Sequence, residues 1–314
     1  MSRVGAIDCG TNSIRLLVAD VDPASGDLVD VVRRMDVVRL GQGVDRTGRI
    51  APEAMARTLA ATADYARVCR ELGVERVRFV ATSASRDAAN RDEFVAGVRD
   101  LVGVEPEVVA GSTEAELSFA GATRELLADG LTGPFVVADI GGGSTEIVRG
   151  SSAVEFARSV DVGCVRLTER HLAGDPPSEA EVVAARADTE AGLDLVAEVV
   201  PMAGASTLVG LAGSVTTVAA CALDLPVYDP ARIHRARLGV DQVRDACDRL
   251  LAMTREQRAA LPYMHPGRVD VIGAGALIWW AVVDRLVEHS GLTDVVVSEH
   301  DILDGIAFSI ASAS

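Results

Sequence analysis

Two glycine turns of this 314-residue sequence carry the side chains that phosphate chemistry needs. The first turn, residues 8–15, reads DCGTNSIR, and the second, residues 139–146, reads DIGGGSTE. Because glycine has no Cβ, the backbone of such a turn can approach a ligand closely, and its N–H groups can line an anion site. Hydroxyl and guanidinium groups add further donors for phosphate oxygens. The sequence therefore predicts two phosphate-binding turns.

Hard oxygen ligands flank the second turn. An apolar strand leads into Asp139, and Glu146 follows the glycine and hydroxyl residues. Carboxylates in this arrangement suit a Mg²⁺ ion bound jointly by the protein and a substrate phosphate, and Mn²⁺ takes the same ligands. Asp8 ends the strand before the first turn in the same way, so it joins them as a candidate metal ligand. The alternative is a hairpin with solvated acids at its edges. The candidate phosphate contacts of this turn are Gly141, Gly142, Gly143, Ser144 and Thr145.

The first turn offers polar donors. Thr11, Asn12 and Ser13 can donate to phosphate oxygens, and Arg15 can form a bidentate pair with one phosphate. Turns of this composition are common, so the prediction depends on its pairing with the second turn. We predict that Cys9 is a small buried residue rather than a nucleophile.

Two further loops follow apolar strands. Residues 81–90, ATSASRDAAN, form either a phosphate-facing loop or a capped helix start with a surface arginine. Residues 208–220, LVGLAGSVTTVAA, form a third glycine turn that opens a helix. The candidate phosphate contacts in these two loops are Ser83, Arg86, Gly213 and Ser214.

Glu114 lies just inside a predicted helix that follows the strand 107–110. A carboxylate there can orient water and accept its proton. A helix dipole also attracts acidic residues to the first turn without any catalysis, and Glu116 is a rival on the same turn. From the residues alone, both interpretations of Glu114 remain open.

All thirty basic residues of the chain are arginine, because the sequence contains no lysine. This excludes a Walker-type phosphate loop, a Schiff base and a lysine general base. Any phosphate held by side-chain charge must therefore meet arginine. A formal net charge of -16 argues against nucleic acid or an anionic membrane as a partner.

Length and cysteine usage indicate the class of protein. At about 150 residues per domain, 314 residues suggest two domains. Five cysteines without a CxxC pair favour a reducing cytosol, and the N-terminus has no signal-peptide pattern. No apolar run reaches the roughly 18 residues of a spanning helix. We expect a cytoplasmic protein, with a homodimer among the oligomeric states left open.

The histidines and tryptophans carry no recognisable site pattern. The five histidines lack metal-ligand spacing, and we expect them to be solvated or structural. We expect Trp279 and Trp280 to be buried in the core or at an interface.

Apolar runs alternate with segments of helical period, which predicts an α/β protein. The two turns repeat one strand–turn–strand plan, with Asp8 and Asp139 lying 139 − 8 = 131 residues apart, which suggests two domains of related fold. The apolar spacing of the C-terminal tail predicts a helix that packs back on the protein. The predicted strands are 4–8, 16–20, 29–38, 77–81, 107–110, 135–139, 146–149, 153–159, 207–210 and 295–298. The predicted helices are 52–72, 91–101, 113–122, 178–202, 215–222, 241–254 and 274–289, with a capping box at Ser178 and Glu181.

In these motifs the sequence resembles the exopolyphosphatase and guanosine pentaphosphate phosphohydrolase (Ppx/GppA) family of the actin-like ATPase/sugar-kinase superfamily. The segments that carry the resemblance follow the family order over almost the whole chain. They are DCGTNSIRLLVAD, RLGQGVDRTGRI, ATSASRDAAN, GSTEAELSFAGA, VADIGGGSTEIV, DVGCVRLTER, LAGSVTTVAA, RVDVIGAGALI and VSEHDILDGIA.

The resemblance implies two actin-like (ribonuclease H-like) domains with a central inter-domain cleft, domain I at 1–122 plus 300–314 and domain II at 123–299. It implies that Glu114 activates water and that Asp139 and Glu146 associate with metal. Arg15 and Arg86 fall where family members contact phosphate, although some members differ at the Arg15 position. Longer relatives continue into helical C-terminal domains, so short polyphosphate chains are the expected preference.

We therefore expect a magnesium-dependent exopolyphosphatase, a phosphoanhydride hydrolase that releases terminal phosphate from inorganic polyphosphate and also acts on guanosine pentaphosphate. Phosphoryl transfer to water is mainly a matter of positioning and charge neutralisation. Two alternatives remain. A small-molecule kinase of the same superfamily would also have paired phosphate turns, and a non-catalytic sensor of polyphosphate or alarmones would bind without releasing phosphate.

Overall fold

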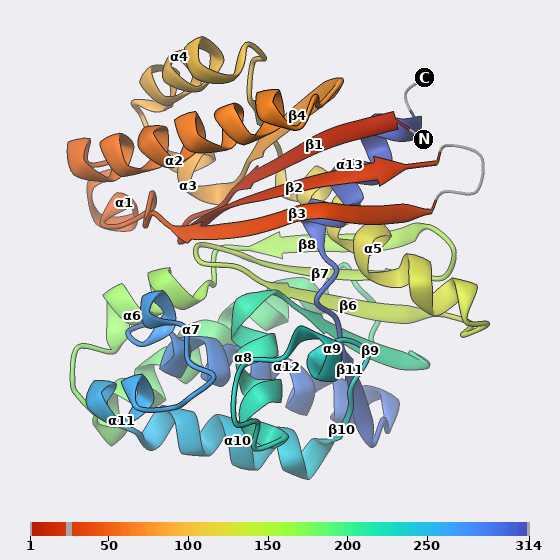
Figure 1. The fold of residues 1–314 in the computed structure, drawn as a ribbon. Helices are drawn as coiled ribbons and strands as arrows, with labels where there is room; N and C mark the ends of the chain where they lie inside the picture. Colours follow the sequence, from red (N-terminus) through yellow and green to blue (C-terminus); the bar gives the residue numbers. More distant parts are fainter. Residues whose placement is uncertain (1, 23–26, 313–314) are drawn as a thin grey trace. The chain divides into compact units, whose positions relative to one another are not determined.

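The computed structural model describes residues 2–22 and 27–312, and its internal contacts divide the chain into two compact units. Unit 1 comprises Met1–Gly121 and Ile302–Ser314, and unit 2 comprises Ala122–Asp301. Each unit is built on one sheet with helices packed against it, which confirms the predicted α/β class (Figure 1). None of the helices in the described part of the chain combines the length and the apolar composition needed to cross a membrane.

The sheet of unit 1 has five strands in the order β3-β2-β1-β4-β5. Strands β1 to β3 form antiparallel neighbours, and β4 and β5 are added in parallel beside β1. Nearly continuous apolar runs in β1 and β2 are typical of strands that are covered on both faces. The strands are β1 (Ser2–Cys9), β2 (Ser13–Val21), β3 (Leu28–Val37), β4 (Arg76–Ala81) and β5 (Glu107–Val108).

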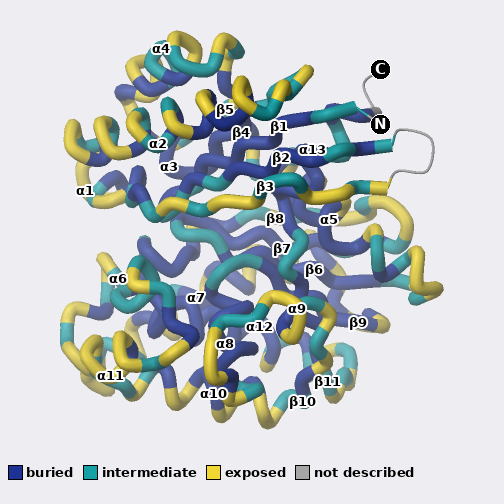
Figure 2. The backbone as a smooth tube through the Cα atoms, in the orientation of Figure 1, coloured by how far each residue is buried: buried dark blue, intermediate teal, exposed yellow. Residues whose placement is uncertain are grey.

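Helices cover both faces of this sheet. Leu16 of β2 packs in one cluster with residues of α2 and α4, whereas Leu17 packs in another with residues of α13. Figure 2 shows β1 and β4 largely buried, with exposed residues along α2 and α4. The tail helix predicted from its apolar spacing therefore forms and packs on the sheet. The helices are α1 (Val44–Thr47), α2 (Pro52–Glu71), α3 (Ser83–Asp87), α4 (Arg91–Val102), α13 (Ile302–Ser312) and α5 (Gly111–Ala128), whose last residues belong to unit 2.

The sheet of unit 2 repeats this plan. Its order is β10-β11-β9-β6-β7-β8, with an antiparallel β6–β7–β8 meander and β9 parallel to β6. The two sheets therefore agree in topology over five strands, with the predicted strand–turn–strand repeat at the centre of each, and unit 2 adds β10 antiparallel to β11 at its edge. Strand β10 was not predicted, because three residues are too few to display a period. The strands are β6 (Phe135–Ile140), β7 (Thr145–Gly150), β8 (Val154–Val160), β9 (Thr207–Leu211), β10 (Arg237–Gly239) and β11 (Asp294–Val297).

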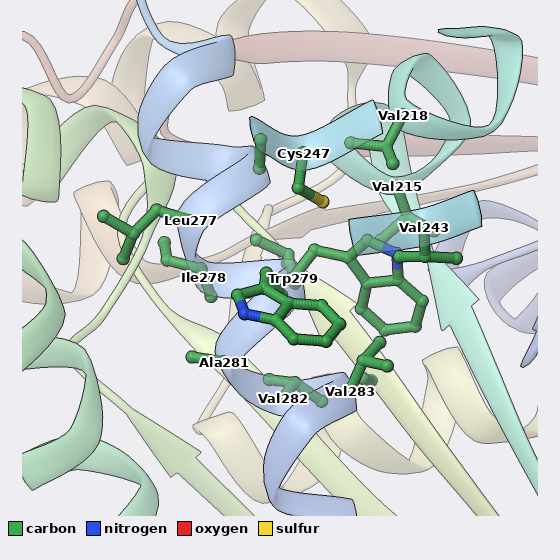
Figure 3. Packing of buried hydrophobic residues seen from close by; sticks show 14 of the residues in the cluster. Val215, Val218, Val243, Cys247, Leu277, Ile278, Trp279, Ala281, Val282 and Val283 are labelled. Atoms are coloured by element: carbon green, nitrogen blue, oxygen red, sulfur yellow. The ribbon is translucent and has the colours of Figure 1, made fainter. Parts of the chain in front are cut away.

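The core of unit 2 is organised around α12 (Ile272–Ser290). Figure 3 shows Trp279 of this helix among Val215, Val243 and Val283. Trp279 is fully buried and Trp280 nearly so, which confirms their prediction as core residues. The other helices are α6 (Cys164–His171), α7 (Glu179–Ala197), α8 (Ala212–Ala222), α9 (Pro230–Ile233), α10 (Val240–Ala252) and α11 (Arg255–Ala259).

The predicted capping box at the start of α7 is confirmed. Ser178 Oγ accepts from the Glu181 N–H, and the Glu181 carboxylate accepts from the N–H of Ser178 at 2.7 Å and of Gly174 at 2.9 Å. The hydrogen bonds from the Ser178 and Gly174 backbone are the main reason that the pKa of Glu181 falls to about 2.

We expect Glu181→Gln to remove a pH-dependent part of the stability, because Gln keeps the cap but not the charge. A lowered pKa stabilises the folded state above the usual value of 4.5, and this contribution is lost as the pH falls toward 2. The urea midpoint of the variant should therefore lie below that of the wild type near neutral pH and meet it at acid pH. Glu179→Gln, exposed in the same turn, is the control and should show a smaller difference at every pH.

Candidate active site

The two predicted turns are hairpin loops with the same geometry. Gly10 N–H donates to Ser13 O at 2.9 Å, and Gly141 N–H donates to Ser144 O at 3.0 Å. The strand residues behind them are paired in the same register, Asp8 with Arg15 and Asp139 with Glu146. Each unit therefore presents one four-residue loop above one pair of polar side chains.

The predicted residues divide between the units. Unit 1 holds Asp8, Thr11, Asn12, Ser13, Arg15, Ser83, Arg86 and Glu114, and unit 2 holds Asp139, Gly141, Gly142, Gly143, Ser144, Thr145, Glu146, Gly213 and Ser214.

In unit 1, Arg15 is bound to Asp8. Its NH2 group donates to Asp8 Oδ2 at 2.6 Å and its Nε donates to the same oxygen at 3.0 Å. Asp8 is buried, while about a fifth of the Arg15 side chain is exposed, at 22%. The pair fixes the guanidinium at the base of the first loop, where it is one cationic group available to an anion.

The first loop and the loop after β4 lie side by side. Strands β1 and β4 are parallel with Cys9 opposite Ala81, so their carboxyl ends meet at one edge of the sheet. Thr11 Oγ1 and Ser83 Oγ lie 2.8 Å apart, and both residues are buried. The structure therefore brings together hydroxyl donors predicted from two separate motifs.

Arg86 and Glu114 form a second polar pair in this unit. Arg86 NH1 donates to Val109 O at 3.0 Å and to Glu114 Oε2 at 3.3 Å. Glu114 lies in the first turn of α5, as predicted, and is 8% exposed, whereas Glu116 is exposed to solvent. The two candidates for the general base therefore lie in different environments, because Glu114 is buried beside Arg86 and Glu116 faces solvent.

Cys9 lies beneath the first loop and is 1% exposed. Burial, followed by the neighbouring charge of Asp8, raises the pKa of its thiol well above the ordinary value. A thiol in this state is a poor nucleophile, which agrees with the prediction of a buried structural role.

In unit 2, the carbonyl groups of the glycine loop accept hydrogen bonds from the first residues of α6. The N–H groups of Cys164 and Val165, at the start of α6, donate to Gly141 O at 3.0 Å and Gly142 O at 2.9 Å. Arg166 Nε donates to Gly143 O at 2.7 Å. Among the described residues, no acceptor contacts the N–H groups of Gly142 or Gly143. The loop therefore offers adjacent backbone donors, as an anion site requires.

We expect Gly163→Ala to disturb this loop. A Cβ at position 163 would lie 2.5 Å from the Gly142 carbonyl, so the loop or α6 must shift. Such overpacking costs about 1–3 kcal/mol. Unfolding midpoints should fall, and turnover should fall further than the loss of folded protein explains. Gly239→Ala is the control, because its φ of -62 is ordinary and its nearest neighbour would lie 3.5 Å away.

Asp139 and Glu146 stand directly opposite each other on β6 and β7, and they are only 7% and 1% exposed. Ser159 Oγ of β8 donates to Glu146 Oε1 at 2.7 Å, which orients this carboxylate. Two like charges facing each other across a strand pair destabilise the sheet, and burial increases the free-energy cost of keeping both carboxylates charged. A bound cation removes this repulsion, so the pair fits an oxygen-liganded metal such as Mg²⁺.

The third glycine turn starts α8 at the same edge of the sheet, because Asp139 of β6 is opposite Leu211 of β9. Ala212 has a φ of 66, and Arg268 lies so close over Gly213 that a Cβ there would be 2.5 Å from the guanidinium carbon. Arg268 NH1 donates to Thr217 Oγ1 at 3.1 Å. Arg268 was not among the predicted residues, although the absence of lysine makes every arginine of a family motif a candidate.

Known proteins resemble this chain over nearly its whole length. The family model of the Ppx/GppA phosphatase family matches residues 17–309. Exopolyphosphatase 2 of Mycobacterium tuberculosis is 53% identical over 318 residues, which cover 99% of each protein. A crystal structure of an exopolyphosphatase-like protein shares 41% identity at a TM-score of 0.95, covering 98% of this chain and 97% of that one. The Ppx/GppA family member of Aquifex aeolicus shares 31% identity at a TM-score of 0.81, with coverage of 98% and 97%.

Proposed function

The chain belongs to the Ppx/GppA phosphatase family of phosphoanhydride hydrolases, and on this premise we propose that it releases the terminal phosphate of inorganic polyphosphate. The observation that carries the proposal is the glycine loop of unit 2, where backbone donors for an anion stand above the opposed carboxylates of Asp139 and Glu146. This combination suits a phosphate that arrives with a divalent cation.

Phosphatases of this family in general depend on a divalent metal. We assign Mg²⁺, with Mn²⁺ as its substitute, to the opposed carboxylates Asp139 and Glu146 of unit 2. Asp8 of unit 1 stays a separate candidate ligand. When bound, the metal neutralises charge on the phosphate that leaves. Ser159 holds Glu146 in one orientation by its 2.7 Å hydrogen bond, which keeps the carboxylate ready to coordinate.

We assign the remaining steps to the protein's own groups. The carboxylate of Glu114 orients a water molecule and accepts its proton. Arg15 and Arg86 bind phosphate oxygens, each held in place by a carboxylate, at 2.6 Å from Asp8 and 3.3 Å from Glu114. The hydroxyl and glycine N–H donors hold the substrate. These donors come from Thr11, Asn12, Ser13, Ser83, Gly141, Gly142, Gly143, Ser144, Thr145, Gly213 and Ser214.

We propose short polyphosphate chains and guanosine pentaphosphate as the preferred substrates. The chain has a formal net charge of -16, so each added phosphate of a long polyanion increases the repulsion. We also assign the protein to the cytoplasm, because its five cysteines are free and buried.

Phosphate release from polyphosphate of defined lengths and from guanosine pentaphosphate tests the proposal. We expect release that needs Mg²⁺, needs no acceptor molecule and is fastest on short chains. Release that requires an acceptor would indicate a kinase, and saturable binding without release would indicate a sensor. Faster release from long chains would contradict the length preference alone.

A further inference from the structure

We propose that Glu125, His234 and His300 bind a transition metal of the zinc class, through residues other than those assigned to Mg²⁺. His234 Nε2 lies 2.7 Å from Glu125 Oε2, and His300 Nδ1 lies 3.4 Å from Glu125 Oε1. The centroids of the two imidazole rings lie 4.4 Å apart, with the ring planes tilted by 35°. One donor atom from each residue lies within 4.8 Å of the other two.

The donor set and the spacing fit zinc. A tetrahedral zinc ion with bonds of about 2.0–2.1 Å sets its ligand atoms about 3.3 Å apart. His234 and His300 face different oxygens of the Glu125 carboxylate, at 2.7 and 3.4 Å, and one atom of each residue lies within 4.8 Å of the others, so side-chain rotation must bring the three donors onto one ion. Two imidazoles and one carboxylate suit zinc, cobalt or nickel, whereas Mg²⁺ prefers oxygen ligands alone.

The cluster is accessible to an ion. The side chains of Glu125, His234 and His300 are 44%, 21% and 30% exposed, which admits an ion and a water as the fourth ligand. The Glu125 carboxylate already faces both imidazoles, so an ion that binds this carboxylate meets two nitrogen ligands.

Metal binding must change one hydrogen bond of the backbone. Glu299 N–H donates to His234 Nδ1 at 3.2 Å, so without metal the ring carries its hydrogen on Nε2 and donates it to Glu125. A metal on Nε2 displaces that hydrogen, Nδ1 becomes protonated, and Glu299 N–H loses its acceptor. Glu299 lies two residues before the end of unit 2 at Asp301, and Glu125 lies three residues after its start at Ala122. The site therefore joins the two segments through which the chain enters and leaves unit 2.

Calorimetric titration of the chelator-treated full chain with Zn²⁺, in the presence of saturating Mg²⁺, tests the proposal. We expect one tight equivalent of Zn²⁺. Loss of a second-shell partner costs about 10–100-fold in affinity, so Glu125→Gln, His234→Gln and His300→Gln should each cost at least that much. His171→Gln is the matched control, because His171 Nε2 also lies 2.8 Å from a carboxylate, that of Asp188, but without a second histidine. The Glu146→Gln variant should retain the tight equivalent.

Two spectroscopic measurements complete the test. Co²⁺ in place of Zn²⁺ should give the strong visible absorption of a four-coordinate ion, and the three variants should lose it while keeping the far-UV circular dichroism of the wild type. The Glu299 amide should exchange faster with Zn²⁺ bound. No tight equivalent, or one that persists when all three residues are replaced, would overturn the proposal.

Discussion

Glu114→Gln is expected to lower the turnover of phosphate release by about 10²–10⁴-fold and to change substrate affinity little. Gln keeps the size and hydrogen bonding of the side chain but lacks the basic oxygen that accepts the proton of water. Glu114 is buried in the first turn of α5 and held by Arg86 at 3.3 Å, so the substitution should not alter the helix. Steady-state phosphate release gives the turnover, and calorimetry with a non-hydrolysable polyphosphate analogue gives the affinity.

Glu116→Gln is the matched control for this prediction. It makes the same chemical change two residues away, on a side chain that is exposed to solvent, and its effect should be mild. If Glu116→Gln lost turnover and Glu114→Gln kept it, the base would be Glu116. If neither substitution mattered, the proposed mechanism would be wrong.

Glu146→Gln is expected to lower turnover by about 10²-fold or more and to raise the Mg²⁺ concentration needed for half-maximal rate. Metal stabilisation of transition-state charge contributes several kcal/mol, and each 1.36 kcal/mol is about tenfold in rate. The same substitution relieves the repulsion with Asp139, so the free energy of unfolding without metal should rise rather than fall. Magnesium titrations of the rate and urea unfolding after chelation measure the two effects.

Glu155→Gln is the control, since Glu155 is an exposed acid on β8. It should leave the magnesium titration unchanged. Phosphate release that survives exhaustive chelation in the wild type would contradict the metal assignment itself. A Glu146→Gln variant that is less stable than the wild type without metal would show that the opposed carboxylates are not under repulsion.

Much of the fold is encoded locally, which is why sequence reasoning reached it. Each of the strands β1 and β6 is an apolar run with an aspartate at its next-to-last position and a glycine directly after its end, so the two signals lie within a few residues of each other. The same local signals occur twice, and each occurrence marks the central hairpin of one sheet, β1–β2 in unit 1 and β6–β7 in unit 2. Short elements were missed: β10 has three residues, too few to show a period, and α6, although amphipathic, spans only eight residues.

The site was predictable where its residues follow a strand end or open a helix. Ser159 reaches Glu146 from the neighbouring strand, and no local pattern marks it. Arg268 reaches Gly213 from another segment of the chain, and only its place in a family motif marks it. The histidines were expected to be solvated or structural because their spacing along the chain carries no ligand pattern. The structure groups His234 and His300 with Glu125 by tertiary folding, which no spacing along the chain could show.

The two hairpins share a register but differ in charge at one position. The residue opposite Asp8 is Arg15, and the residue opposite Asp139 is Glu146. An arginine at that position favours anions and a glutamate favours cations, on an otherwise equivalent backbone. The ion preference of each hairpin is thus encoded in a single cross-strand partner and can be exchanged without any change of fold.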